Sequence, residues 1–362
     1  MNAGGTERVL STLARAWANQ GFDVILATMF SMGGGVDFYP LPPAIRRVRI
    51  ADLLGIKSRS FISQVGRFVL LRRVIQTERP DCVIAFLDQI AVISLLATLG
   101  FSIPIIGSER ANPLLQPLPQ PWWFLRKLAY PRAKGIVIQT PQVKSVLQRI
   151  VSKARLTVIP NPIPPEIEYF HSNARQSGLR LRILSMGRFG AEKNFGLLID
   201  AFSHLATSFT KWDLWIWGEG ELRPQLEKQV ATLGLSDRVF LPGKTSEPWL
   251  EMEKADIVAL TSEFEGFPNV LLEAMALGKP CVASDCAFGP REITGNGEDA
   301  VLFPPGDLQK LVAGLGKLMG DRVERERLGK KALNVWKKYS LEAVLNQWDR
   351  LFQKVIPGWS LS

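Results

Sequence analysis

Two glutamates stand eight residues apart in the stretch S-E-F-E-G-F-P-N-V-L-L-E at 262–273. Glu265 lies in a glycine-containing loop after the run D-I-V-A-L, and Glu273 falls in a helix that we predict to start near Pro268, a residue favoured at the first helical position. The unpaired backbone N–H groups of Asn269 and Val270 would then face an anion. An isolated glutamate is usually solvated, but this helix is largely apolar, so the Glu273 carboxylate needs a partner such as a ribose hydroxyl.

Three further segments follow predicted strands and carry basic residues or glycines. The segment G-R-F-G-A-E-K-N at 187–194 contains Arg188 and Lys193, and an arginine fork beside a lysine point charge suits a diphosphate. The segments at 216–222 (I-W-G-E-G-E-L) and 240–244 (F-L-P-G-K) have glycines that allow close backbone approach. Alone, each basic residue is more typical of a solvated loop. Ligands of open α/β sheets bind at the carboxyl ends of strands, so these positions favour a diphosphate site.

Short β-branched runs alternate with amphipathic stretches, and these elements must position the segments above. The alternation predicts an α/β protein with two doubly wound, mostly parallel sheets. We expect strands at 22–28, 47–50, 82–87, 103–107, 136–139, 157–160, 181–187, 213–218, 238–243, 256–260, 280–284 and 300–303. We expect helices at 5–20, 61–79, 89–99, 141–150, 194–208, 220–233, 268–278, 307–319 and 321–338.

A Pro-rich stretch, P-N-P-I-P-P-E-I at 160–167, predicts a linker between two domains. We therefore expect an N-terminal domain over 1–165 and a second domain over 166–340. The last stretch, 341–362, is expected to be helical and to cross back to the first domain.

The chain opens on M-N-A-G-G-T-E-R-V, which is typical of a strand-to-helix turn, without the central strand that precedes such a turn in a doubly wound domain. Either the start codon lies upstream, or the domain lacks a strand that would be buried on both faces. We favour the first, because loss of a central strand should cost more free energy than the marginal stability of a domain. An in-frame apolar run upstream would support this expectation, and a stop codon would contradict it.

The bulk composition indicates an ordinary globular protein. Of 362 residues, 46% are hydrophobic and 22% charged, which argues against disorder. Three cysteines are too few for a disulfide framework and, with no signal-peptide pattern, favour the reducing cytosol. Two histidines without CxxC or HxxxH spacing nearly exclude a His/Cys metal site. The apolar stretch 83–106 is interrupted by Asp88 and Pro104, which fits buried strands and a short helix better than a membrane span.

Charge is the unusual bulk property. Residues 1–165 hold 20 Lys and Arg against 8 Asp and Glu, whereas the whole chain has a net charge of +10. This asymmetry points to a polyanionic partner or an anionic membrane surface. The segment P-W-W-F-L-R-K at 121–127 pairs aromatic with basic residues, as monotopic anchors do, although packing of Trp122 and Trp123 inside the domain is an equally good interpretation. The basic residues proposed to meet lipid are Arg46, Arg47, Arg49, Lys57, Arg59, Arg67, Arg72 and Arg73.

Together, the four segments resemble the retaining GT-B glycosyltransferases of glycosyltransferase family 4. The resemblance covers essentially the whole chain after the missing strand. Its most specific part is Glu265 and Glu273 with G-F-P-N between them, combined with G-R and E-K-N in 187–194. The opening G-G-T-E-R-V is similar to the family's first glycine turn. The resemblance implies two Rossmann-like domains facing across a cleft, with the donor nucleotide on the second domain and the acceptor mainly on the first.

The resemblance also implies residue roles. Arg188 and Lys193 would hold the donor diphosphate, Glu273 the ribose, and Glu265 the hydroxyls of the transferred sugar, so that Arg188, Lys193 and Glu265 are the catalytic candidates. The other donor-binding candidates are Gly4, Gly5, Gly218, Leu241, Gly243, Phe267, Asn269 and Val270. Transfer with retention would be promoted electrostatically by the basic residues and the helix N-terminus. No D-x-D occurs, so neither a metal nor another cofactor is expected.

The segments F-L-D-Q at 86–89 and I-I-G-S-E-R-A-N-P at 105–113 look like one branch of the family. That branch includes enzymes that extend polyprenyl-diphosphate-linked or surface-polysaccharide oligosaccharides, and it often has a histidine in the second segment, where this chain has Arg110. The acceptor candidates are Asp88, Ser108, Glu109 and Arg110.

We therefore expect transfer of a hexosyl or N-acetylhexosaminyl unit from a nucleotide-diphospho-sugar, with UDP the commoner nucleotide. The acceptor would be a glycan or lipid-linked molecule of cell-surface polysaccharide or glycolipid synthesis, reached from the cytoplasmic face of the inner membrane. The alternatives are a GT-B sugar-nucleotide epimerase, a phosphorylase, or a basic nucleic-acid- or membrane-binding protein without transferase activity. Nothing in the sequence suggests the first two, and no known nucleic-acid-binding pattern is present, so nucleic acid is not an expected partner.

Overall fold

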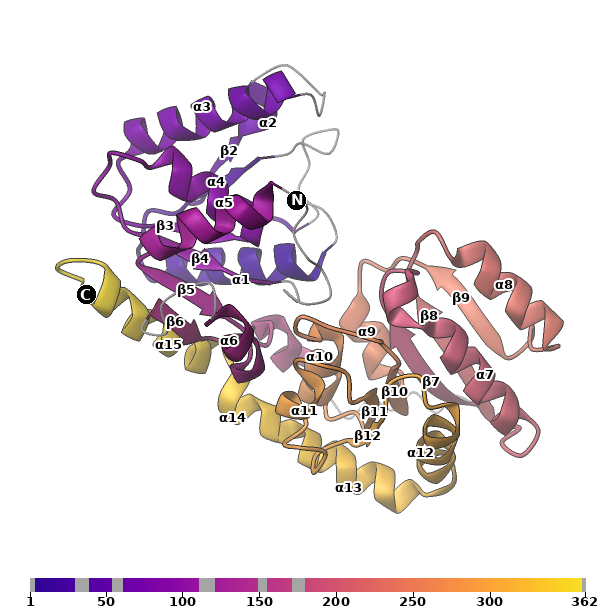
Figure 1. The fold of residues 1–362 in the computed structure, drawn as a ribbon. Coiled ribbons are helices and arrows are strands. Elements are labelled where there is room, and N and C mark those ends of the chain that lie inside the picture. The colour runs from indigo at the N-terminus through magenta and orange to yellow at the C-terminus, as the bar shows by residue number, and fades with distance from the viewer. Residues whose placement is uncertain are drawn as a thin grey trace. The chain divides into compact units, whose positions relative to one another are not determined.

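A computed structural model describes residues 4–29, 39–53, 61–110, 121–148, 155–170 and 180–359. The chain divides into two compact units (Figure 1). The N-terminal unit comprises residues 1–162 and 342–362, and the C-terminal unit comprises residues 163–341. Each unit is built on parallel strands, as the alternating pattern predicts, and the α/β fold class is confirmed.

The N-terminal unit alternates helices and strands. Its strands are β1 (Ile25–Thr28), β2 (Arg46–Arg49), β3 (Val83–Phe86), β4 (Ile105–Ser108), β5 (Gly135–Ile138) and β6 (Leu156–Val158). Its helices are α1 (Gly5–Asn19), α2 (Ile50–Leu53), α3 (Phe61–Glu78), α4 (Asp88–Ala97), α5 (Trp122–Ala129), α6 (Pro141–Leu147) and, from the last part of the chain, α15 (Leu341–Val355).

The strands of the N-terminal unit fall into two separate parallel sheets, one of order β1-β2 and one of order β3-β4-β5-β6. Among the described residues no strand joins these two sheets.

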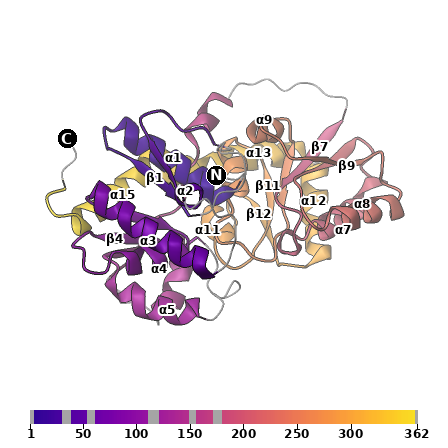
Figure 2. The same ribbon diagram turned by 90° about the horizontal axis from the view of Figure 1, so that it is seen from above.

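Helix α15 packs against helix α1 and against strand β5 of the larger sheet. Trp348 is fully buried, and its ring centroid lies 5.5 Å from that of Trp17 on α1 and 5.7 Å from that of Phe352. A Cβ atom on Gly135, the first residue of β5, would lie 3.3 Å from Leu351, so glycine lets α15 approach the strand closely. Figures 1 and 2 show α15 beside α1 and α3 near α4 and α5.

We expect Trp348→Ala to lower the free energy of unfolding of the N-terminal unit by about 3–5 kcal/mol, because it leaves a large cavity under α15. Urea unfolding monitored by circular dichroism measures the change. Trp123→Ala is the matched control, since Trp123 lies on the same unit with 38% of its surface exposed. Equal midpoints for the two variants would contradict the packing role of Trp348.

The C-terminal unit contains one continuous sheet with helices on both faces. Its strands are β7 (Leu181–Met186), β8 (Trp212–Trp217), β9 (Val239–Gly243), β10 (Ile257–Leu260), β11 (Cys281–Ser284) and β12 (Val301–Phe303). Its helices are α7 (Phe195–Ala206), α8 (Arg223–Thr232), α9 (Pro248–Glu253), α10 (Asn269–Ala276), α11 (Pro290–Ile293), α12 (Leu308–Gly320), α13 (Arg322–Ala332) and α14 (Trp336–Tyr339).

The sheet of the C-terminal unit is parallel, and its strand order is β12-β11-β10-β7-β8-β9. The order runs outward in both directions from the neighbours β7 and β10, which makes this pair the topological switch point of the sheet. Alternate side chains of each strand enter opposite cores. Ile183 packs with the core under α7, α8 and α12, whereas Leu184 packs with the core under α10 and its neighbours. Loops that leave β7 and β10 therefore start side by side.

All twelve strands expected from the sequence are present, each within three residues of its predicted bounds. The predicted single helix over 321–338 is wrong. The chain forms α13, a 3₁₀ turn at Leu333–Val335 and then α14, because the Trp336 indole donates a hydrogen bond to Ala276 O at 2.9 Å and Tyr339 is buried against α10. Helices α2, α5, α9 and α11 are not among the sequence predictions, since four to eight residues carry little helical periodicity.

Candidate active site

An ion pair joins the loops that follow β7 and β10. Lys193 Nζ lies 2.6 Å from Glu265 Oε1, and the two side chains are 19% and 10% exposed. Ser262 Oγ donates a hydrogen bond to the same Glu265 oxygen at 2.7 Å. The structure thus brings together two predicted site residues that are 72 positions apart in the sequence.

The backbones of these two loops are also bonded to each other. Thr261 Oγ1 donates to Lys193 O at 2.9 Å, and the Glu263 N–H donates to Glu192 O at 2.9 Å. The Asn194 side-chain amide bonds the Glu263 carboxylate. Because these hydrogen bonds join the backbones of the two loops, the position of Lys193 does not depend on its ion pair alone.

Arg188, the other predicted diphosphate ligand, stands apart from this pair. Its side chain is 72% exposed, and its Nη2 lies 2.9 Å from Glu192 Oε1. An exposed ion pair of this kind contributes little to stability. The guanidinium can therefore turn toward an anion at small energetic cost.

Glu273 is buried within α10, with 1% of its surface exposed. The Trp249 indole, from α9, donates a hydrogen bond to Glu273 Oε2 at 3.1 Å. The interpretation of Glu273 as a solvent-exposed helix residue is therefore wrong, and the expectation that its carboxylate needs a partner is confirmed. Trp249 was not predicted, because nothing in the segment P-W-L-E-M-E indicates which helix it contacts.

The N-terminus of α10 differs in detail from the prediction. Pro268 is the N-cap and Asn269 the first helical residue. The Asn269 N–H is not unpaired, as expected from the sequence, but donates to Phe267 O at 3.0 Å. Pro268, with φ −78° and ψ 84°, closes this bond as a tight three-residue turn. Phe267 is buried 6.0 Å from the Tyr339 ring, and Val270 packs at the edge of the same core, so the turn is anchored.

Glycines close the carboxyl ends of β7, β8 and β9 into one rigid edge. Gly218 has φ +151°, and a Cβ atom there would lie 1.8 Å from Gly187 O. Its N–H donates to Gly243 O at 2.8 Å, which links the ends of β8 and β9. Leu241 O accepts a hydrogen bond from Arg223 Nη2 at 3.1 Å. Only glycine fits at position 218, because the backbone after β7 lies against it; contact of Gly218 with a donor stays a prediction.

The two predicted donor glycines of the N-terminal unit stand at the start of α1. Gly5 is the first helical residue and Gly4 its N-cap, with extended backbone. A Cβ atom on Gly4 would clash with the Glu7 carboxylate. Their contact with a donor stays a prediction.

The predicted acceptor residues lie at the carboxyl ends of β3 and β4. Asp88 begins α4, and its Oδ1 accepts a hydrogen bond from the Gln89 N–H at 2.7 Å. Ser108, Glu109 and Arg110 are buried, with 1%, 3% and 9% of their surfaces exposed. The three consecutive polar residues therefore lie inside the unit, where each requires polar partners.

The Glu109 carboxylate contacts the side chains of Tyr130 and Arg126. The Tyr130 hydroxyl donates to Glu109 Oε1, and Arg126 Nη1 lies 3.6 Å from the same oxygen. Burial raises the pKa of Glu109 to about 7; the Tyr130 hydrogen bond and the Arg126 charge lower it, and the nearby Asp88 charge raises it. Glu109 therefore titrates in the neutral range within the fold.

Arg110 contacts residues at the ends of β3, β4 and β6. Its Nε donates to Ser108 Oγ at 2.9 Å, and its Nη1 donates to Asn161 Oδ1. Gln139 Nε2 donates to the same Asn161 oxygen at 2.8 Å. The guanidinium lies over the Phe86 ring, 4.6 Å from its centroid. Gln139 and Asn161 were not predicted; polar residues directly after the buried runs I-V-I and T-V-I-P were the available signal.

The basic surface expected on the N-terminal unit is only partly present. Arg46 pairs with Asp23 and Glu78, at 2.8 and 2.6 Å. Arg67 is 4% exposed, and Arg72 donates to Ala97 O at the end of α4 and to Leu99 O just after it. Burial excludes Arg67 from a lipid contact, so that part of the prediction is wrong, whereas contact of Arg46 and Arg72 with lipid stays a prediction. Lys57 and Arg59 lie outside the described residues.

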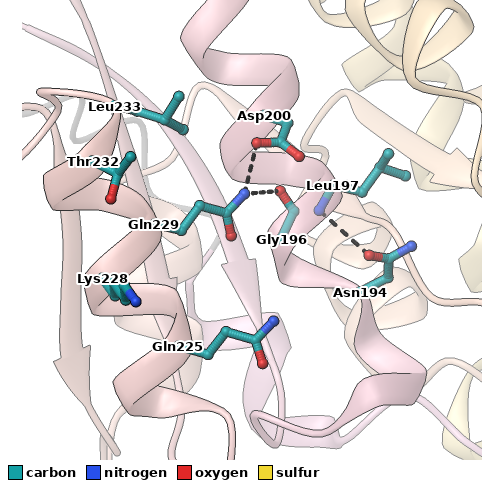
Figure 3. Close-up of a pocket in the computed structure, with 9 residues that line it drawn as sticks. All are labelled: Asn194, Gly196, Leu197, Asp200, Gln225, Lys228, Gln229, Thr232 and Leu233. Carbon is teal, nitrogen blue, oxygen red and sulfur yellow. Dashed lines mark hydrogen bonds between the residues drawn. The ribbon is translucent and has the colours of Figure 1, made fainter.

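A pocket of about 540 Å³ opens between α7 and α8 (Figure 3). Gln229 on α8 donates to Gly196 O and to Asp200 on α7, which closes one side of it. None of its lining residues is a predicted donor residue. In the described part of the chain, no group of three His, Cys, Asp or Glu side chains is placed to hold a metal ion, and no helix has the length and hydropathy to cross a membrane.

Two family models match the chain and together span nearly all of it. The model described as Glycosyltransferase Family 4 matches residues 3–167, and the model described as Glycosyl transferases group 1 matches residues 170–335. The chain belongs to this glycosyltransferase family. The resemblance of the chain to this family is thereby confirmed.

Similar proteins include two bacterial enzymes that match over almost their full length. One is the Campylobacter jejuni GalNAc-α-(1→4)-GalNAc-α-(1→3)-diNAcBac-PP-undecaprenol α-1,4-N-acetyl-D-galactosaminyltransferase, 26% identical over 98% of this chain and 96% of that protein. The other is the amylovoran biosynthesis glycosyltransferase AmsD of Erwinia amylovora, 26% identical over 96% of this chain and 95% of that protein.

Among solved structures, Anabaena HepE in complex with UDP and glucose matches with a TM-score of 0.80 at 20% identity, over 97% of this chain and 96% of that one. The lipopolysaccharide outer core galactosyltransferase WaaB matches with a TM-score of 0.73 at 21% identity, over 98% and 97%. The GT-B fold is thus confirmed.

We expect Glu109→Gln to change the pH dependence of stability. Because the folded pKa of about 7 exceeds the ordinary value of 4.5, wild-type stability from this group is present below pH 4.5 and lost as pH rises through 7. The glutamine variant cannot titrate, so its stability relative to wild type should increase between pH 5 and pH 8 by up to about 3 kcal/mol. Urea unfolding across this range measures the difference. Parallel pH profiles would contradict a neutral-range pKa.

Proposed function

We propose that this glycosyltransferase moves a hexosyl or N-acetylhexosaminyl unit, with retention, from a nucleotide-diphospho-sugar to a glycan or lipid-linked acceptor of cell-surface polysaccharide or glycolipid synthesis. The observation that carries the donor half of the proposal is the contact between Lys193 and Glu265 across the switch point of the C-terminal sheet. Open α/β sheets bind ligands at this position. The contact brings a lysine and a carboxylate side by side, which supports a phosphate site next to a site for sugar hydroxyls.

The proposed mechanism is electrostatic. Negative charge develops on the leaving diphosphate, and Lys193, Arg188 and the N-terminus of α10 offset it. Loop-to-loop hydrogen bonds hold the backbone of the lysine in place before the donor binds. Glu265 binds hydroxyls of the transferred sugar, and Glu273, oriented by the Trp249 indole, binds the ribose. In this proposal these side chains supply the positive charge, and no divalent metal takes part.

The names of similar proteins support the finer parts of the proposal. UDP is bound in the Anabaena HepE complexes, which supports UDP as the donor nucleotide. The Campylobacter enzyme is named for an undecaprenol-diphosphate-linked acceptor, and AmsD for amylovoran synthesis. Galactosyltransferases of lipopolysaccharide synthesis from Salmonella typhimurium and Escherichia coli are 29% identical over about half of this chain. We therefore propose an acceptor among such surface glycans.

We expect Lys193→Ala to reduce kcat for transfer or donor hydrolysis by roughly 10²–10³-fold, because an electrostatic contact to the leaving group is lost. Glu273→Ala should weaken nucleotide binding by roughly ten- to hundredfold, because a charge-assisted hydrogen bond to ribose is lost. A panel of UDP-, GDP- and ADP-sugars in buffer with EDTA measures both, and NMR of the product gives its anomeric configuration.

Lys228→Ala is the matched control for these variants, since Lys228 is an exposed lysine of the same unit that lines the pocket between α7 and α8. Its activity should equal that of wild type. The donor-site proposal fails if no nucleotide-sugar binds, or if EDTA abolishes activity that Mg²⁺ restores.

We also propose peripheral contact of the N-terminal unit with the cytoplasmic face of an anionic membrane, through α5. Trp123, Phe124 and Leu128 on this helix are 38%, 55% and 58% exposed. Lys127 Nζ lies over the Trp123 ring, 4.3 Å from its centroid. Arg126, in contrast, is buried toward Glu109, so the helix has an inner anchoring face and an outer apolar face with a cation. Exposed aromatic and basic side chains of this kind suit a lipid interface.

We expect the triple substitution Trp123→Ser, Phe124→Ser and Leu128→Ser to weaken partitioning onto phosphatidylglycerol-containing vesicles by roughly tenfold or more, because exposed apolar area is removed. Co-sedimentation measures it. Serine at three exposed apolar residues of the C-terminal unit is the matched control, namely Leu233, Val323 and Leu333. If both triple variants partition like wild type, α5 is not the contact.

A further inference from the structure

Arg110 is a buried cation whose described contacts are all neutral. It is 9% exposed, and its hydrogen-bond acceptors are the Ser108 hydroxyl and the Asn161 amide oxygen. The Phe86 ring contacts the guanidinium face. A buried charge without an opposite charge costs free energy, and burial lowers the pKa of Arg110 to about 9.

Not every buried arginine of the N-terminal unit has only neutral contacts, as the residue next to Arg110 shows. Glu109 points to Arg126 and Tyr130, so the carboxylate nearest to Arg110 in the chain is used by another arginine. Arg126 therefore has a counter-charge, and Arg110 has neutral partners that orient it. The Ser108 and Asn161 oxygens accept hydrogen bonds from Nε and Nη1, and the guanidinium lies over the Phe86 ring. These contacts fix the guanidinium without cancelling its charge.

The side chains around Arg110 come from the ends of four parallel strands. Phe86 ends β3, Arg110 follows β4, Gln139 follows β5, and Asn161 follows β6 by three residues. Gln139 and Arg110 both donate to Asn161 Oδ1, which sets the orientation of that amide. The carboxyl edge of a parallel sheet is where such folds bind ligands. Arg110 is thus a preoriented cation at a ligand-binding edge.

We propose that Arg110 binds an oxyanion of the acceptor substrate, either a diphosphate or the carboxylate of an acidic sugar. The inference rests on the proposed function. The donor diphosphate is assigned to Lys193 and Arg188 in the C-terminal unit, and Arg110 lies among the predicted acceptor residues, so we assign its anion site to the second substrate. A planar arginine fork matches the two oxygens of a carboxylate or phosphate. A neutral sugar would leave the buried charge uncompensated.

The test measures binding of inorganic pyrophosphate and of glucuronate to the full chain by calorimetry, in the Lys193→Ala background to remove the donor anion site. Arg110→Gln should weaken binding of one probe by about ten- to hundredfold, since a charge-assisted contact is lost. Loss for pyrophosphate identifies a diphosphate acceptor, and loss for glucuronate identifies an acidic sugar. Arg132→Gln, which removes an exposed arginine of the same unit, is the control and should bind like its parent.

Asn161→Asp tests the charge argument without removing Arg110. The substitution places a carboxylate on the atom that Arg110 Nη1 contacts, so it should raise the thermal midpoint and weaken binding of the same probe by about tenfold or more. A merely structural role for Arg110 predicts the first effect without the second.

Two results would overturn the inference: neither probe binds at millimolar concentration, or both bind equally to Arg110→Gln and its parent. UDP affinity, measured for wild type and Arg110→Gln, separates this inference from the proposed function. If UDP binds both proteins equally and Arg110 has no effect on either probe, only the acceptor-anion inference fails. If wild type does not bind UDP, the proposed function fails.

Discussion

The adjacency of β7 and β10 is the constraint on which the candidate active site depends. Parallel strands end at one edge, and the strand order changes direction between these two, so their loops start as neighbours and diverge. Lys193 and Glu265 meet there although they are far apart in sequence. Moving either strand by one place in the order would separate the pair. The topology of the sheet, more than the strength of one ion pair, therefore positions the proposed donor groups.

The glycines after β7 and β8 show why that edge is rigid. The end of β8 lies so close to the end of β7 that a Cβ atom at Gly218 would overlap Gly187 O, and a Cβ atom at Gly220 would lie 2.5 Å from Phe189 O. Backbone hydrogen bonds then continue past the last strand residues, from Phe189 to Glu219 and from Gly218 to Gly243. Close backbone packing leaves few conformations to the loops, so the proposed phosphate ligands start from a defined scaffold.

The strands and the paired site residues were predictable from the sequence, whereas most partners of the buried polar residues were not. Strands buried on both faces are nearly continuous apolar runs, which is why I-V-A-L and C-V-A are recognisable. The family motif indicated Glu265 and Glu273. The contacts of Trp249 with Glu273 and of Arg110 with Asn161 depend on which helices and strand ends pack together, and they span 24 and 51 residues. A local sequence pattern does not indicate contacts between residues so far apart in the chain. The same limit explains Arg67, which counts as surface charge in the sequence but is buried.

The cations of the two proposed anion sites have different partners, and this difference separates the two sites. In the C-terminal unit, Lys193 and Arg188 each have a carboxylate partner, so an arriving diphosphate must compete with Glu265 and Glu192. In the N-terminal unit, Arg110 has only neutral described contacts. The exposed Arg188 costs little to hold ready and can release Glu192 when an anion binds. A buried cation with neutral partners carries a standing cost that only an anion removes. Arg110 should therefore discriminate more sharply between charged and neutral ligands than the donor-site cations do.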